Sequence, residues 1–138
     1  MEVIMKNPYQ HLVIYYFEGI VKPDRSVTMD TRFLGNWQEA DTSFVFFSQP
    51  VPDLMTRTAD RHPGARLVDV YEMTWEQWHG DCVKPYSVAG FCIFPPWEVP
   101  VNDRNKTRIV LDPGVVFGTG RHQTTHDCLE LVHQVCAA

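Results

Sequence analysis

The sequence predicts a small α+β domain, an extended linker and the beginning of a second domain. Apolar segments of strand length alternate with short helical patterns as far as Phe94. A proline-rich segment interrupts this pattern at Pro95, and a strand–turn–helix pattern follows from Arg108. We therefore expect one sheet with helices on one face in residues 1–94, a linker over residues 95–107, and the start of another domain in residues 108–138.

Runs of apolar, β-branched and aromatic residues predict four strands before the linker. These strands are Leu12–Phe17, Ser43–Ser48, Leu67–Tyr71 and Val88–Phe94. The first run is continuously apolar, which is typical of a strand buried on both faces. In the third strand we expect Val68 and Val70 to face inward and Asp69 to face outward.

Prolines, glycines and tryptophans position the remaining elements. Pro52 suits the first turn of a helix over Asp53–Arg61, which Pro63-Gly64 ends. Trp75 and Trp78 lie one helical turn apart on a short piece, and we expect them to be core or interface anchors. The segment Lys22–Arg32 reads as irregular, and Gly35-Asn36 reads as a break.

The last helix is predicted from a cap and an apolar face. Thr124 is the expected N-cap, and Asp127 completes a variant of the capping box. One face carries residues at helical spacing: Cys128, Leu131, Val132, Val135 and Cys136. Nothing later in the sequence covers that face, so we expect it to fray or to pack against a neighbouring molecule in self-association.

Composition excludes several classes of protein. The 138 residues are 44% hydrophobic and 21% charged, as in ordinary globular proteins. A net charge of -5 argues against direct nucleic-acid binding. No apolar run is long enough for a membrane span or a signal peptide, so we expect a cytoplasmic protein. Four cysteines without a C-x-x-C pair predict reduced, mostly buried thiols: Cys82, Cys92, Cys128 and Cys136.

The segment Leu111–Thr125 is the strongest candidate for a binding site. An Asp-Pro-Gly turn leads into Phe117-Gly118-Thr119-Gly120, and paired threonines then open the helix. Backbone N–H groups of such a loop, beside a helix N-terminus, suit an anionic or carboxylate-bearing ligand. The glycine spacing matches neither a P-loop nor a dinucleotide fingerprint, and an ordinary glycine-containing loop stays an alternative.

Other candidate sites are weaker. His122, His126, Cys128 and His133 lie close in sequence, but surface or structural histidines are expected rather than a metal site. Trp97 is expected to pin the linker against the sheet. No Ser-His-Asp or Cys-His arrangement can be assembled, so no catalytic residue is assigned.

One motif resembles a known family. The residues Leu111-Asp112-Pro113-Gly114 through Phe117-Gly118-Thr119-Gly120-x-His122-x-Thr124-Thr125, followed by Cys128-Leu129-Glu130, are similar to the bacterial ribosomal protein L-eleven methyltransferase family. The segment Phe94–Glu98 and the stretch Trp75–Pro85 also look like family segments. The resemblance covers roughly residues 65–138. The first 60 residues match poorly, because Lys22–Asn36 stands where family members have a clear first helix.

This resemblance implies a two-domain enzyme that binds S-adenosyl-methionine. A ferredoxin-like N-terminal domain would recognise a ribosomal protein, and a Rossmann-like domain would bind the cofactor. Thr125 would contact the cofactor, and the loop Phe117, Gly118, Thr119 and Gly120 would lie over the same site. The family's main glycine-rich cofactor motif would come after Thr125, and this sequence ends before it.

Two functions are therefore expected as alternatives. The first is the N-terminal part of a protein methyltransferase that acts on amino groups of a ribosomal protein, with this chain alone inactive and unable to bind the cofactor well. The second is a stand-alone ferredoxin-like protein-binding module without catalysis.

Overall fold

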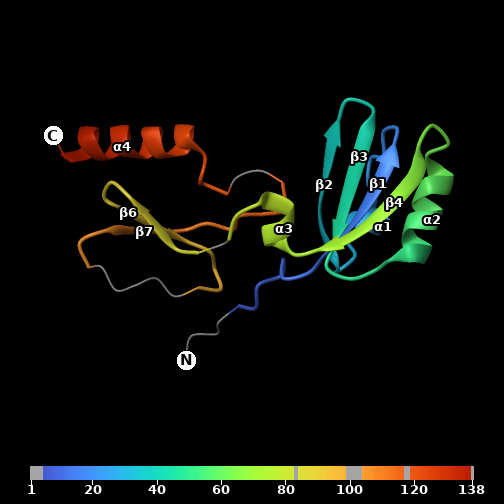
Figure 1. The fold of residues 1–138 in the computed structure, drawn as a ribbon, viewed down its shortest axis with the longest axis horizontal. Helices are drawn as coiled ribbons and strands as arrows, with labels where there is room; N and C mark the ends of the chain where they lie inside the picture. Colours follow the sequence, from blue (N-terminus) through green and yellow to red (C-terminus); the bar gives the residue numbers. More distant parts are fainter. Residues whose placement is uncertain (1–4, 83, 99–103, 117–118, 138) are drawn as a thin grey trace. The chain divides into compact units, whose positions relative to one another are not determined.

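The structure, a computed structural model, describes residues 5–82, 84–98, 104–116 and 119–137 (Figure 1). It is a mixed α/β protein, as predicted. The elements are β1 (Leu12–Glu18), α1 (Arg25–Thr28), β2 (Phe33–Glu39), β3 (Thr42–Phe47), α2 (Pro52–Arg61), β4 (Arg66–Met73), α3 (Trp75–His79), β5 (Tyr86–Val88), β6 (Phe91–Phe94), β7 (Thr107–Val110) and α4 (Gln123–Ala137).

The chain divides into two compact units. The N-terminal unit is Pro8–Asp81, and the C-terminal unit is Cys82–Ala138 together with Met1–Asn7. This division places β5 and β6 with β7, whereas we predicted that one domain extends to residue 94. Whether the functional domains follow the compact units stays a prediction.

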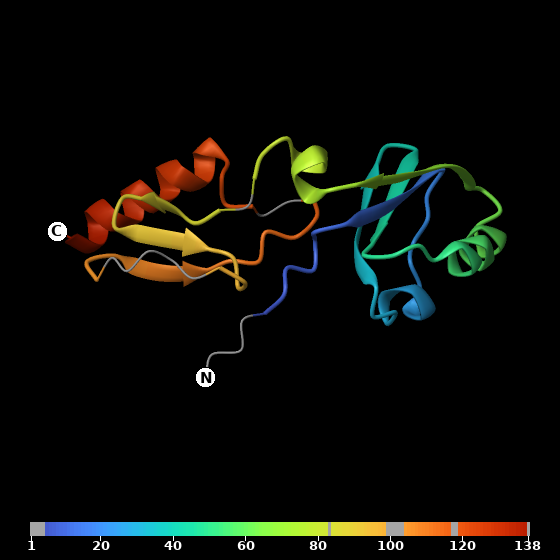
Figure 2. The same ribbon diagram turned by 60° about the horizontal axis from the view of Figure 1, so that its bottom comes forward.

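The N-terminal unit contains a four-stranded sheet in the order β2-β3-β1-β4, and every neighbouring pair is antiparallel. Helices α1 and α2 pack on one face of this sheet (Figure 2), where Val27 and Met55 meet Val13 and Phe17 in the core. Helix α3 packs on the opposite face, where the rings of Trp78 and Phe46 lie 5.2 Å apart.

Strand β1 is buried on both faces, as predicted. Val13 and Phe17 belong to the core beneath the helices, and Leu12 and Ile14 are also fully buried. The Tyr15 hydroxyl accepts a hydrogen bond of 2.8 Å from the Val51 N–H, just before α2. A polar atom inside the core thereby ties the helix entry to the central strand.

The segment Lys22–Arg32, which was predicted to be irregular, contains the short helix α1, and the predicted break at Gly35-Asn36 lies within β2. The Asp24 carboxylate caps α1 by accepting from the N–H groups of Ser26 and Val27. The Ser26 hydroxyl, followed by the backbone N–H groups and Arg61, lowers the pKa of Asp24 to about 2. The predicted break at Gly35 is wrong, because the strand β2 absorbs the glycine in a bulge opposite β3.

Strand β4 differs from its predicted orientation. Val68 and Val70 are each 41% exposed, so neither is buried in the core as the predicted inward orientation requires. Leu67 packs against the core instead. Val68 lies at an irregularity in the pairing of β1 with β4, whereas Val70 is paired with the core residue Tyr15 and is exposed because β4 is at the edge of the sheet.

Helix α3 begins with a capping box that the sequence analysis did not predict. The Thr74 hydroxyl accepts from the Gln77 N–H, and the Gln77 side chain accepts from the Thr74 N–H. This cap directs Trp75 into the protein, where it is 2% exposed. Trp75 is therefore a core anchor, as expected.

The C-terminal unit contains a three-stranded sheet in the order β5-β6-β7. The predicted single strand Val88–Phe94 is wrong, because a turn at Ala89 and Gly90 splits it into the antiparallel pair β5 and β6. Strand β7 pairs in parallel with β6. The segment predicted to be a linker therefore connects two neighbouring strands, and its residues 95–98 form a turn in which the Glu98 N–H donates to the Pro95 carbonyl at 3.1 Å.

Candidate cofactor-binding loop

The candidate loop begins where β7 ends. The Leu111 N–H donates to the Phe94 carbonyl at 2.9 Å, which extends the pairing of β6 with β7 by one step. The Asp112 carboxylate then accepts from the Gly114 N–H at 3.0 Å. This bond makes an Asx turn and confirms the predicted Asp-Pro-Gly turn.

The loop continues through Thr119, Gly120 and Arg121, whereas Phe117 and Gly118 lie outside the described residues. The Thr119 hydroxyl accepts from the Arg121 N–H at 3.3 Å. Gly120 has a φ of +74°. A Cβ atom at this position would lie 2.6 Å from the Tyr86 hydroxyl oxygen and 2.8 Å from Leu111 Cδ2. Position 120 therefore favours glycine for its backbone angle, and a larger residue there would displace the ends of the Tyr86 and Leu111 side chains.

Tyr86 of β5 anchors this loop. Its hydroxyl donates to the Gly120 carbonyl. The Arg121 guanidinium carbon lies 5.1 Å from the centre of the Tyr86 ring, and its Nη2 donates to the Lys84 carbonyl at 2.8 Å. Burial raises the pKa of Tyr86, against an opposing effect of Arg121, so the phenol stays protonated at neutral pH.

His126 of α4 completes this cluster. Its ring stacks on Tyr86 with the centroids 5.4 Å apart and the planes 26° from parallel. Its Nε2 is shielded from solvent and has no hydrogen-bond partner within the described part of the chain. His126 therefore joins the cluster through its ring. Tyr86 was not predicted as a site residue, since no local pattern in the sequence pairs β5 with the start of α4.

Helix α4 begins differently from the prediction. Thr124 lies inside the helix, and its hydroxyl bonds to Nδ1 of His122 at 2.8 Å. Asp127 accepts from the Gln123 side chain at 2.8 Å. The predicted capping box of Thr124 and Asp127 is therefore wrong, because these two side chains bond to His122 and Gln123 instead. The polar ring of His122 stands at the helix start instead.

Thr125 is half-buried in the first turn of α4, and its N–H donates to the His122 carbonyl at 3.0 Å. The described residues offer no hydrogen-bond partner to its hydroxyl. Of the predicted cofactor residues, Thr119 and Gly120 thus serve the internal packing of the loop, whereas the described chain leaves the Thr125 hydroxyl available to a ligand.

The two sides of α4 differ sharply. On one side, His133 lies 6.2 Å from Phe91 between ring centroids, and its ring fills the space that a side chain at Gly90 would need. On the other side, Leu131, Val132 and Val135 are between 48% and 68% exposed. The predicted apolar face is therefore uncovered in the described chain.

The remaining candidates show no second site in the described part of the C-terminal unit. Among the described residues, no three His, Cys, Asp or Glu side chains are placed to hold a metal ion. All four cysteines are free thiols, but Cys128 and Cys136 are exposed, so the prediction of mostly buried thiols is wrong for α4. None of the described helices combines the length and the apolar character that a membrane span requires.

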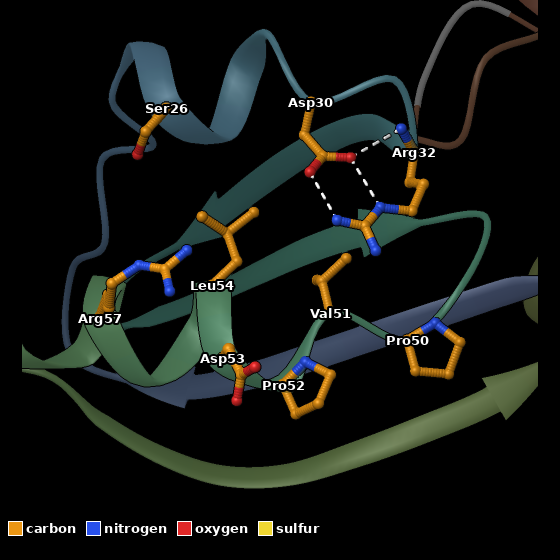
Figure 3. A pocket seen from close by; sticks show the side chains of 9 residues that line it. All are labelled: Ser26, Asp30, Arg32, Pro50, Val51, Pro52, Asp53, Leu54 and Arg57. Atoms are coloured by element: carbon orange, nitrogen blue, oxygen red, sulfur yellow. Dashed lines mark hydrogen bonds and ion pairs between the residues drawn. The ribbon is translucent and has the colours of Figure 1, made fainter.

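The N-terminal unit has a pocket of about 350 Å³ between α1 and the start of α2 (Figure 3). Its floor includes Val51 and Leu54, and Asp53 and Arg57 line it from α2. On the opposite side, Arg32 donates two hydrogen bonds of 2.7 and 2.8 Å to the Asp30 carboxylate. Arg32 lowers the pKa of Asp30 to about 2. No predicted site residue lies in this pocket.

Comparison with known proteins identifies relatives of the chain. The model of a family described as ribosomal protein L11 methyltransferase (PrmA) matches residues 26–138. The match begins upstream of the resemblance seen in the motifs, which covers roughly residues 65–138, and it includes residues 26–60 of the first 60, for which we expected a poor match. The short α1 and the strand β2 thus fall within the family pattern.

Three relatives, each called ribosomal protein L11 methyltransferase, illustrate the extent of similarity. The protein of Thermosynechococcus vestitus is 34% identical over 82% of this chain and 34% of its own length. That of Caldicellulosiruptor saccharolyticus is 38% identical over 51% of the chain and 24% of its own length. That of Trichlorobacter lovleyi is 55% identical over 34% of the chain and 16% of its own length. The matches span at most about a third of these relatives.

Proposed function

The chain belongs to the ribosomal protein L11 methyltransferase family, and from this premise we propose that it is the N-terminal part of an S-adenosyl-methionine-dependent protein methyltransferase. The enzyme would modify amino groups of a ribosomal protein in the cytoplasm. The names of the relatives support ribosomal protein L11 as the substrate. The short span that the matches cover in these relatives supports the view that further chain completes the enzyme.

The proposal gives the N-terminal unit the role of substrate recognition. Its order of elements, β1-α1-β2-β3-α2-β4, and its antiparallel strand order β2-β3-β1-β4 support a ferredoxin-like assignment. The remaining part would begin a Rossmann-like domain. Limited proteolysis tests where the domains divide: cleavage confined to residues 95–107 supports the predicted linker, and cleavage near Asp81 supports division along the compact units.

The C-terminal unit would contribute one edge of the cofactor site. Thr125 fits this role because its hydroxyl is not used by the described chain, and it lies in the first turn of α4, where backbone N–H groups favour a carboxylate. Thr119 and Gly120 would shape the loop through their backbone. S-adenosyl-methionine supplies an electrophilic methyl group on a sulfonium, and residues of this chain would bind and orient it.

The proposed reaction is an in-line methyl transfer to a neutral amine. A bond forms between the amine nitrogen and the methyl carbon as the carbon–sulfur bond breaks, and the sulfur leaves as a neutral thioether. The substituted amine then releases a proton to solvent. The protein would contribute mainly proximity, orientation and an environment in which the amine stays deprotonated. No described residue is assigned as a catalytic base.

A stand-alone protein-binding module is the second candidate. The observation that favours it is the self-contained core of the N-terminal unit beneath α1 and α2. The gene sequence beyond Ala138 distinguishes the two functions. A downstream strand ending in a Gly-x-Gly-x-Gly turn supports the methyltransferase, and a stop codon supports the module.

The direct experiment is methyl transfer from radiolabelled S-adenosyl-methionine to purified ribosomal protein L11, with the complete product of the gene and with the 138-residue chain. The methyltransferase proposal expects label transfer by the complete product alone. Absence of transfer by both proteins would favour the binding module.

A further inference from the structure

The loop before α4 is held by a side chain that lies more than thirty positions earlier in the sequence. Tyr86 and Gly120 are separated by 34 positions, yet the Tyr86 hydroxyl donates to the Gly120 carbonyl. The same tyrosine ring also contacts Arg121 and His126, which flank the helix start. One side chain thus touches the loop and the first turn of α4 together.

The close contact between Tyr86 and the loop depends on residue 120 being a glycine, which has no side chain. Gly120 allows the hydroxyl oxygen to approach within 2.6 Å of the place where a Cβ would stand. The Arg121 side chain adds a second attachment, because it bonds to the Lys84 carbonyl just before β5. The segment Thr119–Arg121 is therefore fixed by a hydrogen bond at Gly120 and two contacts from Arg121.

These contacts at Gly120 and Arg121 fix the position of Thr125 in the first turn of α4. The chain runs from Arg121 directly into His122, whose carbonyl accepts from the N–H groups of Thr125 and His126 in the first turn of α4. A loop with a free backbone would lose conformational entropy when a ligand orders it. Because Tyr86 holds the Gly120–Arg121 turn in advance, a ligand at Thr125 meets a turn that is already ordered.

We infer that Tyr86 is a positioning residue, which holds the Gly120–Arg121 turn so that Thr125 and the start of α4 meet S-adenosyl-methionine in one orientation. This inference rests on the proposed function. Tyr86 does not touch the cofactor; it acts through Gly120 and Arg121.

Tyr86→Phe is the informative variant because it removes the hydroxyl and keeps the ring beneath Arg121 and His126. Tyr71→Phe is the matched control, since Tyr71 lies on β4 of the N-terminal unit and is 39% exposed. Amide hydrogen exchange on the 138-residue chain should show the Arg121 N–H exchanging about fivefold faster in Tyr86→Phe than in the wild type, as expected for one lost hydrogen bond. The control should leave it unchanged.

The second measurement is made on the complete methyltransferase. A preordered loop stabilises the bound ground state and the transition state equally, so Tyr86→Phe should raise KM and Kd for S-adenosyl-methionine by about fivefold and leave kcat unchanged. A residue needed only for folding would instead lower the amount of active enzyme without changing KM.

Unchanged exchange at Arg121 in Tyr86→Phe would overturn the anchoring of the loop. Faster exchange with an unchanged Kd would overturn the positioning role and leave the proposed function intact. A wild-type enzyme that binds no S-adenosyl-methionine would overturn the proposed function and the positioning role together.

Discussion

The two compact units differ in how they are held together. In the N-terminal unit, a sheet face and two helices enclose residues with almost no exposure, such as Val13, Phe17 and Phe47. In the described part of the C-terminal unit, the buried apolar side chains are fewer and smaller: Val88, Cys92, Ile93, Pro95, Pro113 and Val115. Helix α4 buries none of its residues.

This difference shows that stability and site geometry have separate sources in this chain. Apolar burial stabilises the N-terminal unit in the ordinary way. The candidate loop is positioned instead by a phenol, a guanidinium and an imidazole around Gly120.

The largest expected difference in unfolding free energy is between a variant in the N-terminal core and a variant on α4 of the C-terminal unit. Phe47→Ala should lower the free energy of unfolding by about 3–5 kcal/mol, because it opens a cavity beneath α1 and α2. Leu131→Ala, at a position 61% exposed on α4, should change it by less than about 0.5 kcal/mol. Urea unfolding followed by tryptophan fluorescence measures both. Equal losses for the two variants would mean that α4 is packed as firmly as the sheet.

An intermediate effect concerns the candidate cofactor contact. In the complete enzyme, Thr125→Ala should weaken S-adenosyl-methionine binding by about 1 kcal/mol, or about fivefold, through one lost hydrogen bond. Thr56→Ala on α2 is the control, since its hydroxyl bonds within its own helix, to the Pro52 carbonyl. A cofactor titration that finds equal affinity for Thr125→Ala and the wild type would remove Thr125 from the site.

The smallest expected effect is a decrease in the stability of the N-terminal unit at acidic pH. The pKa values of Asp24 and Asp30 are lowered to about 2 in the folded protein, from about 3.9 in unfolded chains. A lowered pKa contributes stability above about pH 4, and this contribution is lost as the pH falls towards 2. Urea midpoints between pH 5 and pH 2 should therefore decrease, and Asp30→Asn should flatten the decrease.

Asp53→Asn is the control for this measurement, since Asp53 lines the same pocket as Asp30 and takes part in neither ion pair. Both ion pairs are partly exposed, so the effect is expected to be small. An equally flat profile for Asp53→Asn would show that Asp30 has no special role.

Local patterns predicted the elements whose neighbours are close in sequence. Three features were predicted correctly because each depends on a few consecutive residues: the apolar run of β1, the proline at the start of α2 and the Asp-Pro-Gly turn. Val68 was misplaced because of an irregularity in strand pairing, and Val70 because β4 is an edge strand. Pairing between strands distant in sequence leaves no local signal.

The same limit applies to the candidate site. Thr119, Gly120 and Thr125 were found because the motif is contiguous. Tyr86 was missed because its partner lies 34 positions away, across a strand pairing that the sequence does not reveal. The apolar positions of α4 also identified the side of the helix that is exposed. The side that contacts the sheet carries His126 and His133, whose rings lie against Tyr86 and Phe91.

Calorimetric titration of S-adenosyl-methionine into the purified 138-residue chain tests the central claim most directly. We propose that the C-terminal unit forms one edge of a cofactor site, whose remaining walls lie in other parts of the enzyme. We expect no measurable heat of binding to the chain and clear binding to the complete enzyme. A micromolar Kd for the chain itself would contradict this expectation, because the loop and α4 would then form a complete site.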